Sequence, residues 1–130
     1  MIKKTKKIII IEDDLAIVDI YKIIMKKAHL NVEAISSGGE AIRRIKEMVE
    51  NNEPNPDIIL IDLILPDING MEVFRIIKEN NQTKHIKTFI LTNQENSELQ
   101  WLSKLRPEKF LIKANTSPTK LLKLIKEELK

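Results

Sequence analysis

The sequence predicts an α/β protein built on one open parallel sheet with helices on both faces. Two observations predict this fold class. Short apolar runs alternate along the chain with longer segments whose apolar residues follow helical spacing, a pattern typical of βαβ units. Five such units are too few to close a barrel, and right-handed crossovers then wind the helices onto both faces. We therefore expect a doubly wound sheet.

Five apolar runs are predicted as strands. The runs that contain only apolar residues, such as 8–11 and 58–61, should be central in the sheet because both of their faces are buried. The run at 31–35 alternates polar and apolar residues, which indicates an edge strand. The full set of predicted strands is 8–11, 31–35, 58–61, 88–91 and 110–112.

A predicted amphipathic helix follows each strand. The first extends from Asp14 to Ala28, and the last begins with Ser117 as N-cap and Pro118 in its first turn. The apolar positions at helical spacing are Ile17, Ile20, Tyr21, Ile24 and Ala28; Ala41, Ile42, Ile45, Met48 and Val49; Val73, Phe74 and Ile77; Leu99, Leu102 and Leu105; and Leu121, Leu122, Ile125 and Leu129. Strands and helices together give a (βα)5, flavodoxin-like order.

Length and composition indicate a single domain, with a core at about residues 6–130 of the 130. The chain has no cysteine, which excludes disulfides and thiolate metal sites and fits a reducing compartment. Its apolar runs are too short to span a membrane and it begins with no secretory signal, so we expect a cytoplasmic protein. The net charge of +3 is spread over a lysine-rich surface, and no direct DNA binding is expected.

Polar side chains follow four of the predicted strands. In an open α/β sheet, ligands bind beyond the carboxyl ends of the strands, where the winding direction switches. Each residue alone has an ordinary interpretation, such as an Asp that caps the next helix, but all of them fall on the edge of the sheet where this fold places its ligands. They are Glu12, Asp13 and Asp14 after the first strand, Asp62 after the third, Thr92 after the fourth and Lys113 after the fifth.

This set of side chains suits phosphoryl chemistry. Clustered carboxylates raise one another's pKa unless a cation neutralises them, and oxygen ligands favour a hard ion such as Mg²⁺. An ammonium and a hydroxyl opposite the ion could bind phosphate oxygens. A carboxylate held there can attack phosphorus and become an aspartyl phosphate. Asp62 is the candidate with no capping role and with an open loop beyond it.

With these residues the chain resembles the receiver domain of bacterial two-component response regulators, from about Lys6 to Lys130. The motif residues that carry the resemblance are the acid pair Glu12 and Asp13; Asp62 followed by Pro66 and Gly70; Thr92; and Phe110 three residues before Lys113. Taken together they are highly specific, although each is weak alone. The chain departs from the pattern at Ala114, where many members carry a cis proline, at Asn93, and in the approach to the fifth strand at 105–110.

The resemblance implies a role for each of these residues. Asp62 would accept a phosphoryl group from a sensor histidine kinase or phosphotransfer protein. Asp13, Asp62 and the backbone carbonyl of Ile64 would bind Mg²⁺, with Glu12 acting through a coordinated water. Thr92 and Lys113 would bind the phosphoryl oxygens.

Phe110 would turn inward as Thr92 moves, and this would switch the surface of helix 4, strand 5 and helix 5, which could also form a homodimer. No output domain follows Lys130, so we expect a regulator that acts by protein contact or the receiver of a longer protein. Such a module is not an enzyme on a separate substrate and catalyses only its own phosphorylation and dephosphorylation.

Three alternatives remain from the residues alone. An Asp-nucleophile phosphatase of the haloacid dehalogenase type requires a second acid two residues after the nucleophile, where this chain has Ile64. A flavodoxin-like flavin carrier requires a phosphate-binding loop after the first strand, where this chain places acids. A pseudo-receiver that is not phosphorylated would be a pure interaction module, although every residue needed for phosphorylation is retained.

Overall fold

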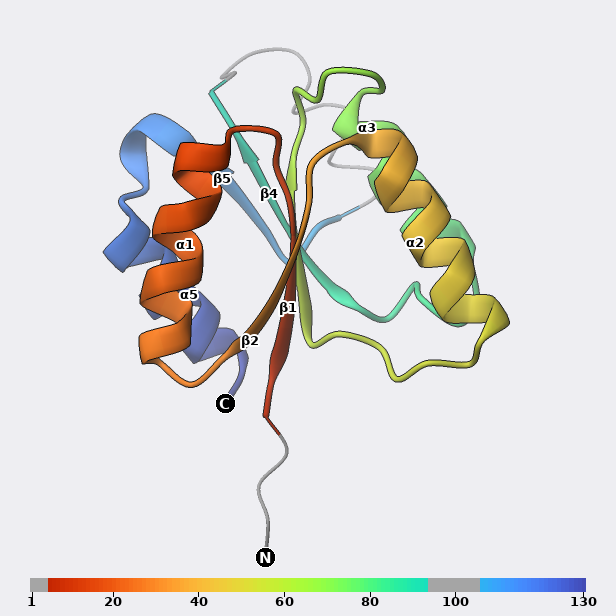
Figure 1. The fold of residues 1–130 in the computed structure, drawn as a ribbon, viewed down its shortest axis with the longest axis horizontal. Coiled ribbons are helices and arrows are strands. Elements are labelled where there is room, and N and C mark those ends of the chain that lie inside the picture. Colours follow the sequence, from red (N-terminus) through yellow and green to blue (C-terminus); the bar gives the residue numbers. More distant parts are fainter. Residues whose placement is uncertain (1–4, 94–105) are drawn as a thin grey trace, which may run out of the picture.

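A parallel five-stranded sheet in the order β2-β1-β3-β4-β5 forms the centre of the computed structural model, which describes residues 5–93 and 106–130 (Figure 1). The strands are β1 Lys7–Ile11, β2 Asn31–Ile35, β3 Ile58–Asp62, β4 Lys87–Thr92 and β5 Lys109–Ile112. The helices are α1 Leu15–Lys27, α2 Gly38–Glu50, α3 Gly70–Glu79 and α5 Pro118–Glu128, with a 3₁₀ turn at Lys113–Asn115.

Helices cover both faces of the sheet. Figure 1 shows α1 and α5 on one face and α2 and α3 on the other. Strand side chains alternate between two cores, as the two-residue period of a strand requires. The core on the α2/α3 face receives Ile9, Ile11, Ile59, Ile61 and Ile90 from the strands. The core on the α1/α5 face receives Ile8, Ile10, Ile58, Leu60, Phe89 and Leu91.

This topology confirms the predicted doubly wound parallel sheet, and 31–35 is indeed an edge strand. One part of the strand prediction is wrong. The all-apolar run 110–112 lies in β5, which is the opposite edge of the sheet rather than a central strand, and its residues are only partly buried. An open sheet necessarily has two edges, and β5 forms the second in the observed strand order. The helix predicted around 99–105 lies outside the described residues.

The buried face of α1 includes the predicted Tyr21, with Ile17 and Ile24 packed against the core, but the predicted Ile20 is not part of it. Its buried residues are Val18, Tyr21 and Met25, whereas Ile20 is 46% exposed and Ile23 is 57% exposed. The apolar residues of this helix extend round more than one face, so helical spacing alone did not select the buried positions.

Local hydrogen bonds fix where the helices begin. Asp14 caps α1 by accepting from the N–H groups of Ala16 and Ile17, which is the ordinary role of an acid after a strand. Ser117 accepts from Lys120 N–H at 3.1 Å, and Pro118 occupies the first turn of α5, as predicted.

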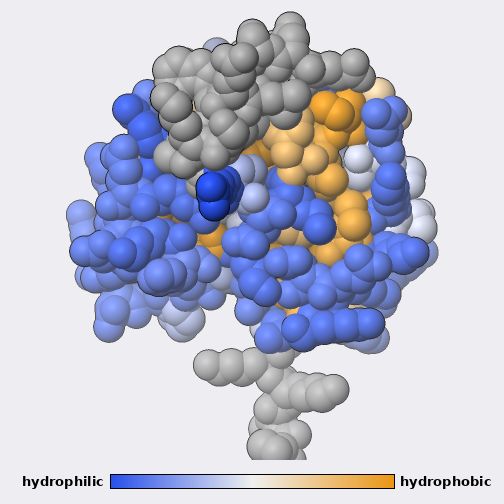
Figure 2. All heavy atoms as spheres, turned by 180° about the vertical axis from the view of Figure 1, so that it is seen from behind, coloured by the Kyte–Doolittle hydropathy of each residue, from blue (hydrophilic) through white to orange (hydrophobic). Residues whose placement is uncertain are grey.

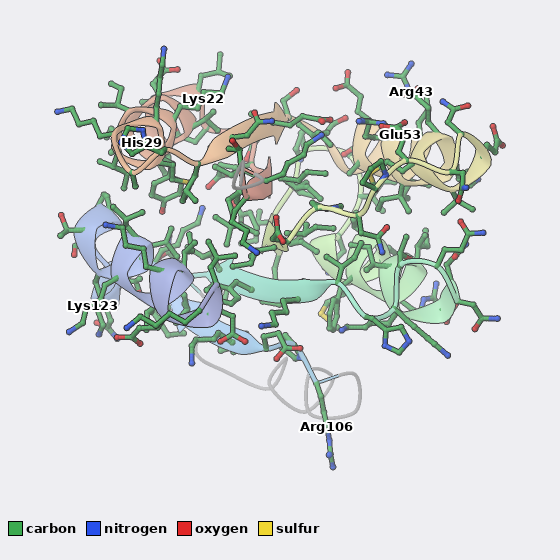
Figure 3. All side chains as sticks on the ribbon, turned by 90° about the horizontal axis from the view of Figure 1, so that it is seen from below. Lys22, His29, Arg43, Glu53, Arg106 and Lys123 are labelled. Atoms are coloured by element: carbon green, nitrogen blue, oxygen red, sulfur yellow. The ribbon has the colours of Figure 1, made fainter. Side chains whose placement is uncertain are left out.

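Charged side chains form the outer surface. Figure 3 shows Lys22 on α1, Lys123 on α5 and Arg43 on α2 projecting away from the sheet. The rear of the molecule is mostly hydrophilic, but apolar atoms gather on part of this face (Figure 2). Among the helices in the described residues, none has the length and apolar character needed to span a membrane.

Candidate functional site

The carboxyl ends of β1, β3 and β5 bring three polar residues together at one edge of the sheet. Glu12 and Asp62 each follow by two positions a residue in the core of the α1/α5 face, Ile10 and Leu60, and Lys113 begins the 3₁₀ turn directly after β5. Successive side chains of a strand point to opposite faces, so residues two apart share a face. Residues separated by up to 101 positions in the sequence therefore meet at this edge.

Lys113 connects the two buried acids. Its Nζ donates to Glu12 Oε1 at 2.5 Å and to Asp62 Oδ2 at 2.8 Å. Glu12 is 3% exposed and Asp62 is 7% exposed. Asp62 Oδ1 accepts from the N–H of Ile64 at 3.0 Å, and Glu12 Oε2 accepts from the N–H of Asp13 at 3.0 Å. Both buried carboxylates are thus held by several donors, as buried charges require.

Asp13 completes a cluster of three carboxylates. Ligand oxygens of Glu12, Asp13 and Asp62 all lie within 4.8 Å of one another, and Asp13 is exposed while the other two are buried. A set made only of oxygens, open to solvent on one side, fits Mg²⁺, which keeps several waters and takes few protein carboxylates. Within this cluster Lys113 pairs with Glu12 and Asp62, and Asp13 is the carboxylate on the solvent side.

The electrostatics of the site follow from burial and from this pairing. The pKa of Glu12 is raised to about 7, first by burial and then by the neighbouring Asp62 carboxylate, while Lys113 acts against both. Burial lowers the pKa of Lys113, but its hydrogen bonds to Asp62 and Glu12 outweigh that effect, and the net shift is upward. A second cation at this site would therefore relieve an excess of negative charge.

Thr92 and Phe110 lie on the other face of the sheet. Thr92 ends β4 with no exposed surface, directly after Leu91, which pairs with Asp62 on the neighbouring strand. Phe110 pairs with Ile90 and packs partly buried against the α2/α3 core. Thr92 lies two residues beyond Ile90 and therefore shares this face. It is close to Phe110 because Phe110 pairs with Ile90 on the neighbouring strand. The two residues of the predicted switch are neighbours.

The loop after Asp62 is held in a way that the sequence analysis missed. Gly70 begins α3 against the end of β3, where its N–H donates to the carbonyl of Leu63 at 2.8 Å. The Asp67 carboxylate reaches the N-terminus of α2 and accepts from the N–H groups of Gly38 and Gly39 at 2.9 and 2.8 Å. These backbone hydrogen bonds lower the pKa of Asp67. The adjacent glycines at 38 and 39 were the available signal, since they leave backbone donors unobstructed.

The turn after Lys113 accommodates Ala114 at the position where many receiver domains carry a cis proline. No cis peptide bond occurs in the described residues, so the Lys113–Ala114 bond is trans. The chain instead makes a 3₁₀ turn at Lys113–Asn115, and Thr116 Oγ1 donates to the Ile112 carbonyl at 2.9 Å. Lys113 nevertheless reaches both acids, so the different turn keeps the site intact.

An open doubly wound domain with an acid cluster and a lysine at the carboxyl edge of its sheet defines a class of signalling module. A family model described as the response regulator receiver domain matches residues 8–126. The chain belongs to this family, the receiver domains of two-component response regulators, which confirms the resemblance drawn from the motif residues.

Individual relatives are distant. The DNA-binding response regulator MtrA of Mycobacterium tuberculosis is 25% identical over 76 residues, which are 58% of this chain and 31% of that protein. The chain thus spans about a third of the length of the curated relatives it matches.

Two solved structures show the same fold over most of the chain. The phosphorylated cyanobacterial phytochrome response regulator RcpA has 25% identity and a TM-score of 0.80, covering 95% of this chain and 91% of that one. The Mn²⁺-bound form of response regulator Rcp1 has 28% identity and a TM-score of 0.76, covering 88% and 86%.

Proposed function

We propose that Asp62 accepts a phosphoryl group from a phosphohistidine of a sensor kinase or phosphotransfer protein. The observation that carries the proposal is the position of its carboxylate at the end of β3, bonded to Lys113 at 2.8 Å inside a three-carboxylate cluster. A carboxylate oxygen forms the new O–P bond while the P–N bond breaks, and the imidazole leaves as a neutral base that keeps the proton already on its other ring nitrogen. Phosphorylated RcpA supports the proposal as a relative of the same fold.

Asp13 and Asp62, with the backbone carbonyl of Ile64, would hold Mg²⁺, and Glu12 would act through a coordinated water. The bound ion would neutralise charge on the phosphoryl oxygens. The Mn²⁺-bound form of Rcp1 supports a divalent cation in a domain of this kind.

Lys113 keeps an anionic partner throughout the reaction. In the unphosphorylated protein its ammonium is bonded to Asp62 and Glu12. After transfer the Asp62 carboxylate is an acyl phosphate, and the phosphoryl oxygens replace it as acceptors for Lys113. Thr92, at the end of the adjacent strand, would supply a hydroxyl to another phosphoryl oxygen.

The output would depend on the proximity of Thr92 to Phe110 on the α2/α3 face. When Thr92 moves toward the phosphoryl group, it vacates space that the partly buried Phe110 ring can fill. The surface changed in this way includes β5 and α5, which would contact a downstream protein or a second copy of the chain. The module catalyses only its own phosphorylation and dephosphorylation.

The test is incubation with phosphoramidate and Mg²⁺, followed by intact mass measurement of the wild-type protein, Asp62→Asn and Asp57→Asn. Asp57 is a matched control because it is an aspartate at the opposite end of the sheet, where it accepts from Lys7 N–H at 2.8 Å. We expect the mass of one phosphate on the wild-type and Asp57→Asn proteins and none on Asp62→Asn. Labelling of Asp62→Asn at the wild-type rate would refute the assignment.

A further inference from the structure

The tyrosine of α1 lies beneath the acid cluster. Tyr21 is 7% exposed and belongs to the core of the α1/α5 face, the face that also carries Glu12 and Asp62. Side chains of a helix lean toward its N-terminus, and α1 begins directly after the acids. The phenol ring of Tyr21 therefore extends toward the carboxyl edge of the sheet.

A small cavity lies beside Tyr21 and the two buried acids. It is lined by Tyr21, Glu12 and Asp62, together with aliphatic side chains of β1, β3 and β4, and its volume is ≈ 10 Å³. A single water requires about 10–15 Å³ measured in this way and two or more polar partners. Glu12, Asp62 and Tyr21 are the residues with polar side chains among those that line the cavity, and its volume is at the lower end of the range that holds one water.

The hydroxyl of Tyr21 makes no hydrogen bond to any residue that the structure describes. Buried tyrosine hydroxyls usually find a partner. Every fully enclosed polar side-chain atom in residues 5–93 and 106–130 has one, so the Tyr21 oxygen must still be reached by solvent. Burial raises the pKa of Tyr21, which also responds to Lys113, Glu12 and Asp62, so the phenol lies within reach of their charges.

We propose that Tyr21 is a positioning residue of the phosphorylation site, whose hydroxyl holds one water in this cavity and through it donates to the Glu12 carboxylate. This inference rests on the function proposed above and adds a residue to it. Glu12 already accepts from Lys113 and from the N–H groups of Asp13 and Asp14, and the water would add one more donor to its carboxylate. The Glu12 side chain is then held in one orientation relative to the other two carboxylates of the cluster.

We expect the loss of the Tyr21 hydroxyl to weaken Mg²⁺ binding while the fold stays intact. Groups that orient metal ligands contribute substantially to metal affinity, and the loss of one water-mediated hydrogen bond corresponds to roughly a threefold to tenfold change in Kd. Tyr21→Phe keeps the ring and removes only the hydroxyl. We expect its Mg²⁺ affinity, measured by calorimetry, to fall by that factor.

The matched control is Thr83→Val. Thr83 is also buried, with 1% exposure, and its hydroxyl donates to the Ile77 carbonyl at 2.7 Å, away from the acid cluster. This variant removes a buried hydroxyl and its hydrogen bond but should leave Mg²⁺ affinity unchanged. Urea unfolding of both variants separates a loss of stability from a loss of metal affinity.

A double-mutant cycle with Glu12→Ala tests the route. If Tyr21 acts through Glu12, Tyr21→Phe weakens Mg²⁺ binding in the wild-type background and has no further effect in Glu12→Ala. A high-resolution crystal structure of the metal-free protein should show a water within hydrogen-bonding distance of the Tyr21 oxygen and Glu12.

An empty cavity, an unchanged affinity in Tyr21→Phe, or equal losses in both backgrounds would each overturn the role of Tyr21 and leave the phosphorylation of Asp62 standing. A wild-type protein that binds no Mg²⁺ would instead refute the proposed metal site, and this inference with it.

Discussion

Replacing Gly70 with alanine should disrupt both the stability and the chemistry of this domain. An added Cβ at this position would lie 2.2 Å from the carbonyl oxygen of Asp62 and 2.8 Å from the Cα of Leu63. Both are backbone atoms, so no side-chain rotation can relieve the contact. Gly70 does not have a positive φ, so the requirement for glycine here is one of space.

The magnitude follows from the distances. A carbon and a carbonyl oxygen need a separation of roughly 3.2 Å or more, so α3 and the end of β3 must move apart by about 1 Å. Overpacking of this kind costs about 1–3 kcal/mol, and losing the hydrogen bond from Gly70 to Leu63 adds about 1 kcal/mol. We expect the free energy of unfolding to fall by about 2–4 kcal/mol.

The displaced atoms belong to the residue that would accept the phosphoryl group. A misplacement of about 1 Å in a reacting group can reduce a rate by about 100-fold. Phosphorylation of Gly70→Ala by phosphoramidate and Mg²⁺, followed by intact mass, should therefore be slower by up to about that factor. Urea unfolding at the same pH gives the stability of the same sample.

Gly39→Ala is the matched control. Its added Cβ meets only Asp67 Oδ2, at 2.9 Å, which is the far end of a side chain that can shift. We expect a stability change within about 1 kcal/mol and a phosphorylation rate close to wild type. The reasoning would be refuted by a Gly70→Ala protein that is phosphorylated at the wild-type rate and whose free energy of unfolding lies within about 0.5 kcal/mol of wild type. That difference is the usual scatter of surface substitutions.

Three further predictions concern single positions. Because the folded-state pKa of Glu12 is raised from 4.5 to about 7, mainly by burial, its favourable contribution is complete below pH 4.5 and is lost as the pH rises through 7. Without metal, Glu12→Gln should therefore have a higher free energy of unfolding than wild type above pH 7, by up to about 3 kcal/mol. Urea unfolding of both proteins at about pH 6 and 8.5 measures this difference, and no gain at the higher pH would contradict the prediction. His29 follows α1 with φ 61°, and Leu30 N–H donates to the Met25 carbonyl as in a Schellman motif. Because glycine adopts a positive φ without strain, His29→Gly should raise the free energy of unfolding by about 0.5–1 kcal/mol. A decrease would show that the His29 side chain contributes contacts. The acyl phosphate should last for many minutes because the side chain of Ile64, 55% exposed beside Asp62, offers no hydrogen bond to an attacking water. After desalting, mass spectrometry should show that Ile64→Asn loses its phosphate severalfold faster than wild type. Equal rates of loss would show that this apolar side chain does not affect hydrolysis.

Much of the site could be predicted from the sequence because it depends on strand ends. A buried strand is a short apolar run, and the polar residue that follows it must lie at the carboxyl end of the strand, where the sheet binds ligands. Asp62 and Lys113 were found in this way, and the structure places them 2.8 Å apart. The direct ion pair between Lys113 and Glu12 was not predicted, because an acid cluster and a lysine do not reveal which acid the lysine contacts.

The residues that the sequence analysis missed act across elements. Asp67 holds the N-terminus of α2 from a loop 28 residues away, and Tyr21 was identified only as an apolar position of its helix. Ile20 shares the helical spacing of Tyr21 yet is exposed, because the rotation of α1 about its own axis depends on what it packs against. Periodicity gives the existence of a buried face but not always its direction.

The sequence by itself determined the order of strands and helices, the edge position of β2, the residues at the strand ends and, through them, the family. These features depend on local chemistry: apolar runs exclude water, caps satisfy backbone donors, and strand alternation has a fixed period. Only the tertiary structure decided that Lys113 bridges Glu12 and Asp62, that Gly70 is required for space, and that Tyr21 shares a small cavity with the two buried acids. Those facts depend on distances between segments that are remote in the chain, and such distances are set by packing.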